Sequence, residues 1–302
     1  MKVISLCIPT NGIREWVFPA LDSIYRQNID DSIFEVIVTD NGIDNSFYNE
    51  MTEYKKCHNN LIYQRNNTIQ FENQLECLKL ASGEYLKFVN HRSIIMDGRL
   101  DMMIEFILRN IDSKPVIYFS NGAMGWGPTN KKYDSFDAFV RTLRRYASWT
   151  GGVGIWREDY LKLPTDFEYD MISPHSSVLF SERNKSEYII NDTYWMREIS
   201  SDHSKKGRYD LYKAFGVEEL SITLDMYKQG DISAETFKSV KKDYGDFLSE
   251  LYYKFNVKEE PCSYYLGGFD DAMGIFFDKE TILKNVEKIA KNVEDNMKEV
   301  DK

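Results

Sequence analysis

Short apolar runs alternate with longer amphipathic stretches over the first 120 residues. The run Val3–Ile8 is almost continuously apolar, which is typical of a strand buried on both faces. Further β-rich runs predict strands over 34–39, 61–64, 84–89 and 116–120. Apolar positions at helical spacing predict helices between them, over 19–27, 47–56, around Phe71–Leu78 and around Leu100–Ile107. This order predicts an α/β fold with a mostly parallel sheet covered by helices.

The pattern changes after residue 120. A loop with three glycines is expected over 121–130, followed by a helix over 136–146 and a glycine-rich strand over 150–156. Pro174 predicts the start of a short helix over 174–183, and Pro19 suits the first turn of its own helix. From about 208 the pattern is helical and charged, and it closes with an amphipathic helix over 279–300. We therefore expect a sheet domain over 1–200 and a helical region over 201–302.

Composition narrows the classes of function. The 302 residues include 38 Lys and Arg against 48 Asp and Glu, a formal net charge of -10. This balance disfavours nucleic-acid binding and polybasic attachment to anionic lipid, because both depend on clustered cations. No segment approaches the roughly 20 consecutive apolar residues that a membrane helix needs. The short apolar stretch over 1–8 is interpreted as a strand and not as a signal peptide. We expect a cytoplasmic protein whose four separated cysteines are free thiols.

Polar residues follow each predicted strand of the sheet. They are Pro9-Thr10-Asn11, Asp40-Asn41-Gly42, Arg65-Asn66-Asn67 and Asn90-His91-Arg92. Open α/β sheets bind ligands beyond the carboxyl ends of their strands, so these residues are the candidate site. No glycine-rich dinucleotide fingerprint and no Walker loop is present, so phosphate would have to be held in another way.

Four segments resemble the nucleotide-sugar-binding half of family 2 glycosyltransferases of the GT-A fold. They read VISLCIPTN over 3–11, LDSIYRQ over 21–27, EVIVTDNG over 35–42 and ASGEYLKF over 81–88. The resemblance covers roughly the first 110 residues. It implies a GT-A fold with a helical C-terminal extension and a nucleoside-diphosphate sugar as donor.

The resemblance also implies roles for the residues at the strand ends. Pro9, Thr10 and Asn11 would line the base and ribose, and Asp40 would accept a hydrogen bond from the base edge. The remaining candidates for the donor nucleotide are Asn41, Asn66, Asn73, Asn90, His91 and Arg92. Alternatives stay open, because Asp40 and Asn41 also suit a tight turn before Gly42, and Asn73 could be an ordinary polar position of its helix.

The sequence departs from the family after the fourth strand. Family members carry an Asp-x-Asp or Asp-Asp motif there for a divalent cation, whereas His91 and Arg92 stand at that place here. Imidazole and guanidinium groups cannot replace hard carboxylate ligands of magnesium or manganese, so we expect no metal cofactor. Arg92, assisted by His91, would instead stabilise the leaving diphosphate directly. Two alternatives are a non-catalytic nucleotide-sugar-binding or scaffold protein, and a metal site that uses Asp97 or Asp101.

The second half would bind the acceptor. The stretch Thr150–Arg157 resembles the strand before the family's acceptor site, where Trp149 could stack on a sugar while Trp156 is better explained as core. His175 stands where the family places its general base, and Asp170 is the next candidate. The Pro-His pair is similar to bacterial abequosyltransferase-like enzymes. A helix-start histidine that binds substrate or faces solvent is the alternative.

Taken together, the resemblance implies transfer of a sugar to a glycan or lipid-linked sugar acceptor in surface polysaccharide synthesis, with inversion. The enzyme would work in the cytoplasm or against the inner face of the membrane. The loop over 121–130 could close over the donor, and the basic run His203–Arg208 could contact an acceptor phosphate or be a solvated loop. The last helix could cover the site, bind a partner or pair with a second copy in a homodimer.

Overall fold

The computed structural model describes residues 2–199 and 203–300, and it divides into two compact units. Unit 1 contains the residues up to 139 together with 146–199, and unit 2 contains 140–145 together with 203–300. The expected boundary between 200 and 201 lies outside the described residues. In the stretches 2–199 and 203–300, none of the helices combines the length and the apolar character needed to cross a bilayer.

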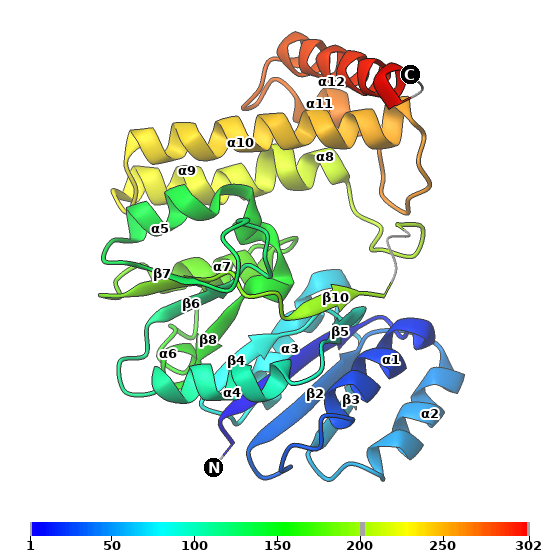
Figure 1. Cartoon of the computed structure of the whole chain (residues 1–302), viewed down its shortest axis with the longest axis vertical. Helices are drawn as coiled ribbons and strands as arrows, with labels where there is room; N and C mark the ends of the chain where they lie inside the picture. Colours follow the sequence, from blue (N-terminus) through cyan, green and yellow to red (C-terminus); the bar gives the residue numbers. More distant parts are fainter. Residues whose placement is uncertain (1, 200–202, 301–302) are drawn as a thin grey trace. The chain divides into compact units, whose positions relative to one another are not determined.

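A five-stranded sheet forms the centre of unit 1 (Figure 1). Its order is β3-β2-β1-β4-β8, with β8 antiparallel to β4 and the other neighbours parallel. The strands are β1 (Ile4–Thr10), β2 (Phe34–Asp40), β3 (Leu61–Arg65), β4 (Tyr85–Phe88) and β8 (Gly154–Trp156). The register pairs Thr10 with Asp40 and Asp40 with Arg65, so the ends of three strands are level.

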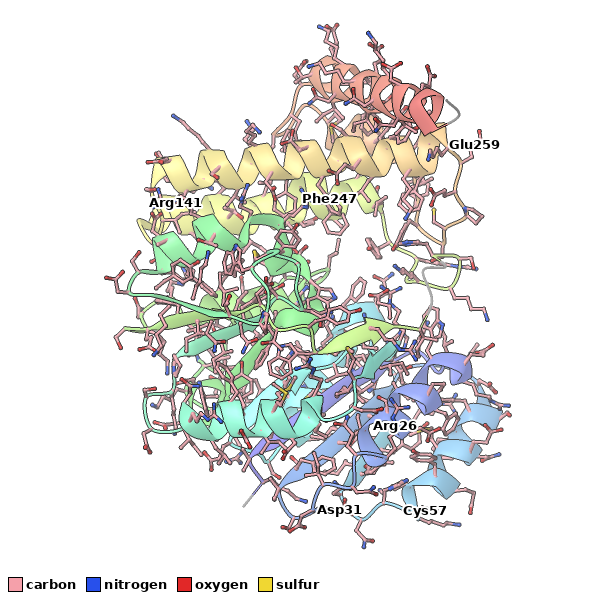
Figure 2. All side chains as sticks on the ribbon, viewed as in Figure 1. Arg26, Asp31, Cys57, Arg141, Phe247 and Glu259 are labelled. Atoms are coloured by element: carbon pink, nitrogen blue, oxygen red, sulfur yellow. The ribbon has the colours of Figure 1, made fainter. Side chains whose placement is uncertain are left out.

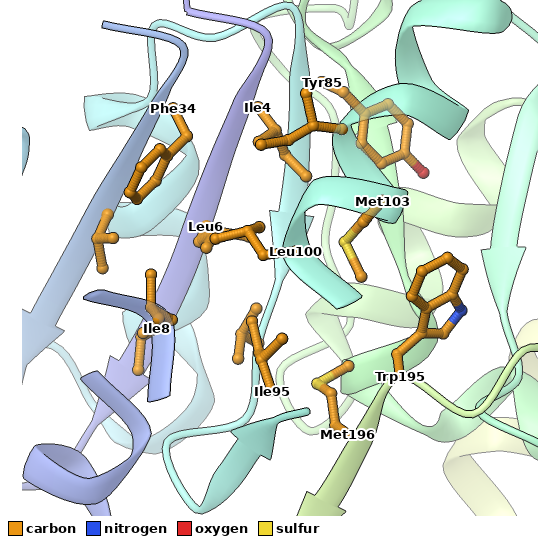
Figure 3. Packing of buried hydrophobic residues seen from close by; sticks show 14 of the residues in the cluster. Ile4, Leu6, Ile8, Phe34, Tyr85, Ile95, Leu100, Met103, Trp195 and Met196 are labelled. Atoms are coloured by element: carbon orange, nitrogen blue, oxygen red, sulfur yellow. The ribbon is translucent and has the colours of Figure 1, made fainter. Parts of the chain in front are cut away.

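Helices cover both faces of this sheet, as the sequence predicts. On one face, Ile4, Leu6 and Ile8 belong to the same buried cluster as Leu100 and Met103 (Figure 3). On the opposite face, the Cys77 thiol lies 2.9 Å from the Thr39 hydroxyl. The helices are α1 (Arg14–Tyr25), α2 (Asn45–Lys55), α3 (Asn73–Leu80) and α4 (Arg99–Arg109). The fold is the expected GT-A arrangement of a mostly parallel sheet between helices.

Several expected elements differ from the structure. Helix α1 begins at Arg14, so Pro19 lies inside it and not in its first turn. The expected strand over 150–156 is only β8, because Thr150–Gly152 forms a 3-10 turn. A Cβ at Gly152 would lie 2.2 Å from the Tyr118 ring, so this turn requires glycine.

The run 116–120 forms β6 (Val116–Phe119), but this strand does not join the central sheet. It pairs with β9 (Tyr188–Asn191), which also pairs with β7 (Asn130–Tyr133). A further two-stranded sheet joins β5 (Ser93–Ile95) to β10 (Met196–Glu198). These partners come from residues far apart in the chain, which local periodicity does not reveal.

The second half of unit 1 otherwise consists of short helices. They are α5 (Phe136–Leu143, which continues into unit 2), a 3-10 turn at Arg144–Ser148, α6 (Arg157–Tyr160) and α7 (Pro174–Ser181). Pro174 is at the first position of α7, as predicted. Trp156 is buried in the core, also as predicted, and its indole donates to the Pro115 carbonyl at 2.7 Å.

Unit 2 is helical over most of its described residues, in agreement with the sequence pattern. Its helices are α8 (Leu211–Lys213), α9 (Glu219–Gln229), α10 (Ala234–Tyr252), α11 (Phe269–Ala272) and α12 (Lys279–Val300). Its core includes Tyr212, Leu248, Phe255 and Ile282, which reach it from α8, α10, the π-helical turn Tyr253–Val257 and α12. The four cysteines of the chain are all free thiols, as expected.

Candidate functional site

A connected polar network lies at the carboxyl edge of the central sheet. Asp31 and Cys57 precede β2 and β3, so they mark the opposite, amino edge (Figure 2). The network begins at Asp40, which is 1% exposed at the end of β2. Its Oδ1 accepts from the Gly42 amide at 2.7 Å, and its Oδ2 accepts from the Tyr63 hydroxyl at 2.9 Å. Burial raises the pKa of Asp40 above its usual value, although both hydrogen bonds oppose the shift.

Gly42 lets this loop close tightly. A Cβ there would lie 2.4 Å from the Asn11 carbonyl oxygen and 2.9 Å from Asp40 Oδ1. No other residue fits without moving the backbone, so the loop after β2 is held against the loop after β1. Asn11 is exposed beside this contact, and Pro9 is half-buried on β1.

Thr10 connects the end of β1 to the segment after β4. Its hydroxyl accepts from the Gly12 amide at 3.1 Å and lies 2.8 Å from His91 Nδ1. The His91 ring packs edge-to-face on Trp16, with centroids 5.1 Å apart. Burial, and secondly the neighbouring Arg92, lower the pKa of His91 to about 3. His91 is therefore neutral and orients Thr10 without contributing charge.

The asparagines of the network have different surroundings. The Asn73 amide donates both hydrogens to backbone, to the Thr10 carbonyl at 3.0 Å and the Thr39 carbonyl at 2.8 Å. Its Oδ1 accepts from Asn66 at 2.7 Å. The buried Asn73 thus joins α3 to the ends of β1 and β2, and it has no donor left for a nucleotide. Its expected role in donor binding stays a prediction, and its contacts favour the structural alternative.

Asn41 and Asn90 both shape loops. The Asn41 amide donates to the Thr68 and Gln70 carbonyls at 3.1 and 3.0 Å, which fixes the loop after β3. Asn90 Oδ1 accepts from the Arg92 amide at 3.2 Å and turns the chain after β4. The sequence-predicted donor residues are therefore brought together at one edge, although their roles stay predictions.

A family model described as glycosyl transferase family 2 matches residues 5–160, more than half of the 302 residues. The chain belongs to glycosyl transferase family 2. Family membership makes it a glycosyltransferase. No curated protein sequence matches the chain.

Solved glycosyltransferase structures share its fold. A structure titled S. aureus TarS 1-349 in complex with UDP-GlcNAc is 16% identical with TM-score 0.56, over 91% of this chain and 80% of that one. The mannosyltransferase PcManGT from Pyrobaculum calidifontis, in complex with GDP-Man and Mn2+, is 14% identical with TM-score 0.52, over 74% and 64%. Another S. aureus TarS structure has a TM-score of 0.48, and the present protein covers 43% of the length of that TarS chain. At these identities the likeness supports the fold alone.

The residues at the end of β4 do not fit a hard divalent cation such as magnesium or manganese. Asn90, His91 and Arg92 supply one amide, one imidazole and one cation, and His91 Nδ1 is already bonded to Thr10. Across residues 2–199 and 203–300, no group of three His, Cys, Asp or Glu side chains is arranged to hold a metal ion. Whether the enzyme needs a cation stays a prediction, and we derive no step through one.

Arg92 carries the positive charge at this position. Its side chain is 11% exposed, and its Nη2 donates to Glu198 Oε1 at 2.9 Å. Its Nη1 is buried and has no hydrogen-bond partner among the described residues. A buried guanidinium nitrogen without an acceptor is costly, so this atom lacks a partner that a ligand could supply.

A cavity of about 210 Å³ lies next to this ion pair, within unit 1. Trp149 and Glu198 lie on its wall, and Ser93, which follows Arg92, is part of the lining. The other lining residues are Tyr118, Ser120, Asn121, Ala123, Tyr146, Met196 and Arg197. Sequence reasoning missed Glu198, because it is 106 residues from Arg92 and no local motif marks it.

His175 is buried at the start of α7, and both ring nitrogens contact protein. Nε2 lies 2.8 Å from the Ser148 carbonyl, and Nδ1 lies 3.1 Å from Gln74 Oε1. Burial lowers the pKa of His175 to about 4, so the ring is neutral. A neutral ring donates only one hydrogen, so Nε2 donates to Ser148 and the Gln74 amide is turned to donate to Nδ1. The expected general-base role stays a prediction, and these contacts favour a structural role.

Asp170 has a different environment. Its Oδ1 accepts from the Ile172 and Ser173 amides at 2.9 and 2.6 Å, and the side chain is half-buried. Its Oδ2 has no bond to any residue that the structure describes. The bonds to Oδ1 therefore orient the carboxylate, and Oδ2 is left to interact with a substrate.

The glycine-rich loop after β6 is anchored at its start. Asp192, which is 1% exposed, accepts from the Met124 amide at 3.0 Å and the Trp126 amide at 2.7 Å. The Ser120 hydroxyl donates to the same carboxylate at 2.6 Å. These bonds hold residues 120–126 in place, so any closure over the donor would be confined to the rest of the loop.

Proposed function

We propose that this protein transfers a sugar from a nucleoside-diphosphate sugar to a hydroxyl of a glycan or lipid-linked acceptor, without a metal ion, and with inversion. The supporting observation is the buried, unpartnered Nη1 of Arg92 at the edge where Thr10 and Asp40 lie. A diphosphate offers the oxygen acceptors that this guanidinium lacks.

The structural neighbours support a donor of this class. Two carry UDP-GlcNAc or UDP, and a third carries GDP-Man, according to their titles. The buried carboxylate of Asp40 would accept an N–H of the nucleobase, since its oxygens have lone pairs left after bonding Gly42 and Tyr63. The exposed Asn11 and half-buried Pro9 would lie along the ribose.

In the proposed reaction, an acceptor oxygen forms a bond to the anomeric carbon while the bond from that carbon to the phosphate oxygen breaks. The acceptor's proton moves to a carboxylate, and the electron pair of the broken bond stays on the diphosphate. Arg92 stabilises this leaving group by charge and directed hydrogen bonds. The lowered pKa of His91 leaves its ring neutral, so the role of His91 is limited to holding Thr10.

Asp170 is our preferred general base. Its free Oδ2 can receive a proton, whereas both nitrogens of His175 are engaged. Two backbone amides orient the carboxylate through its other oxygen. We place Trp149, on the cavity wall, against the apolar face of a sugar.

The Pro174-His175 pair supports kinship with abequosyltransferase-like enzymes, and through it a role in surface polysaccharide synthesis. We place the reaction in the cytoplasm or at the inner face of the membrane.

The decisive test is turnover in the presence of a chelator. Release of nucleoside diphosphate from a panel of nucleotide sugars should persist in EDTA, and Arg92→Ala should lower it at least 100-fold, as removal of one transition-state donor does. Arg109→Ala is the matched control, because Arg109 forms only an exposed pair with Glu105 on α4. Loss of activity in EDTA, restored by Mg2+ or Mn2+, would overturn the metal-free mechanism. Tight nucleotide binding with no turnover under either condition would support the non-catalytic alternative.

A further inference from the structure

The guanidinium that would hold the donor is already paired with a carboxylate. Arg92 and Glu198 form a bond of 2.9 Å between Nη2 and Oε1, and their exposed fractions are 11% and 41%. The two residues come from the segment after β4 and from the end of β10, which lies beside β5 (Figure 1). The ion pair therefore occupies one of the two nitrogens with which Arg92 could grip a diphosphate.

The main chain fixes both partners and leaves one side chain able to move. The Ile199 amide donates to the Arg92 carbonyl at 2.9 Å, and Glu198 pairs with Ser93 in the β5–β10 register. Arg92 is almost enclosed, whereas the Glu198 carboxylate is close to solvent on the cavity wall. A change of rotamer at Glu198 alone would free Nη2 without unpairing the strands.

Charge makes the two anions competitors. A nucleoside diphosphate and the Glu198 carboxylate are both negative, and a diphosphate held by both terminal nitrogens of Arg92 would need Nη2 as well as the unpartnered Nη1. Near a partly buried guanidinium their repulsion is screened less than at an open surface. A bound diphosphate would therefore favour displacement of the carboxylate.

We propose that Glu198 is a displaceable counter-ion of Arg92, which yields to the donor's diphosphate and re-forms the ion pair when the nucleoside diphosphate leaves. The inference rests on the proposed function, because it assigns the ligand of Arg92 to that donor. The pair keeps Arg92 oriented in the empty enzyme and weakens the hold on the product. Glu198 thus acts as a positioning residue through Arg92.

A role for Glu198 as the general base does not fit this geometry. In an inverting displacement the base and the leaving diphosphate lie on opposite faces of the sugar. Glu198 is bonded to the group that would bind the diphosphate, so it lies on the side of the leaving group.

The test is the affinity for nucleoside diphosphate, measured by calorimetry with UDP and GDP in EDTA. Glu198→Gln keeps an oxygen acceptor for Arg92 but removes the competing charge, so it should bind the preferred nucleotide about fivefold more tightly. Product inhibition should strengthen by the same factor. Glu187→Gln is the matched control, since Glu187 pairs with Lys132 at 2.8 Å in an exposed ion pair on the β7–β9 sheet, and it should leave the affinity unchanged.

A double variant separates this role from simple support of the fold. In an Arg92→Ala background, Glu198→Gln should no longer tighten binding, because the competition requires the guanidinium. Weaker or unchanged binding in Glu198→Gln alone would overturn the inference. If the wild type binds neither nucleotide and releases no nucleoside diphosphate from the panel of nucleotide sugars, the proposed function fails instead, so the two failures are distinguishable.

Discussion

Two segments of unit 1 each place a histidine beside a charged residue, and the comparison shows which side chains are available for chemistry. His91 and Arg92 follow β4, whereas Asp170 and His175 flank the start of α7. In both segments burial keeps the histidine neutral, with the pKa lowered to about 3 for His91 and about 4 for His175. His91 bonds protein through Nδ1, and His175 through both ring nitrogens. In both, the charged neighbour has an atom without a partner among the described residues: Arg92 Nη1 and Asp170 Oδ2.

The two segments differ in the surroundings of the unpartnered atom, which is Nη1 in Arg92 and Oδ2 in Asp170. Arg92 Nη1 is buried and has no acceptor among the described residues, which suits a fixed anion such as a diphosphate. Asp170 is half-buried and oriented by backbone amides, which suits a carboxylate that must exchange a proton with an arriving substrate. The histidines bond other parts of the protein, and the charged neighbours are the candidates for the chemistry itself.

The largest expected effect in this comparison, beside that of Arg92, concerns the general base. Asp170→Asn should lower kcat about 1000-fold, because loss of a positioned base typically costs two to four powers of ten. His175→Gln should cost less than about 10-fold if the ring is structural. Steady-state kinetics of both variants, with Asp166→Asn in the exposed preceding loop as control, measures the difference. The reverse order of effects would return the base role to His175.

The next effect concerns the nucleobase. Asp40→Asn removes the charge that accepts an N–H, so the affinity for the preferred nucleoside diphosphate should fall about thirtyfold. Asp30→Asn, at the exposed amino edge of the sheet, should leave it unchanged. An unchanged affinity in Asp40→Asn, measured by calorimetry, would reduce Asp40 to a turn residue.

A further effect is a pH dependence of stability. In the unfolded chain histidine has a pKa near 6.5, whereas buried His175 has a pKa of about 4. Below pH 6.5 the unfolded chain therefore binds a proton that the folded chain refuses, and the free energy of unfolding falls as the pH drops towards 4. Between pH 7 and pH 5 the wild type should lose about 2 kcal/mol more than His175→Gln in urea unfolding. Equal losses would show that His175 is not a buried neutral ring, and the contribution of His91 cancels in this comparison.

The sequence predicted the central sheet because its signals are local. The apolar run of β1 and the Asp40-Asn41-Gly42 turn are visible within a few residues, and four such segments in order indicated the GT-A fold. The arrival of Asp40, Thr10 and His91 at one edge followed from the rule that parallel strands end together.

The remaining contacts could not be predicted because they depend on long-range pairing. β6 joins β9 and not the central sheet, and Glu198 reaches Arg92 only through the β5–β10 pair. The burial of His175 depends on Gln74 of α3 and the Ser148 carbonyl, which no pattern around residue 175 reveals.

The most direct test of the central claim is a crystal structure with the preferred nucleoside diphosphate, grown and soaked in EDTA. We predict Arg92 Nη1 at roughly 2.8 Å from an oxygen of the β-phosphate, with the Glu198 carboxylate moved away from Nη2. A diphosphate bound away from Arg92, with the Arg92–Glu198 pair intact, would contradict the account.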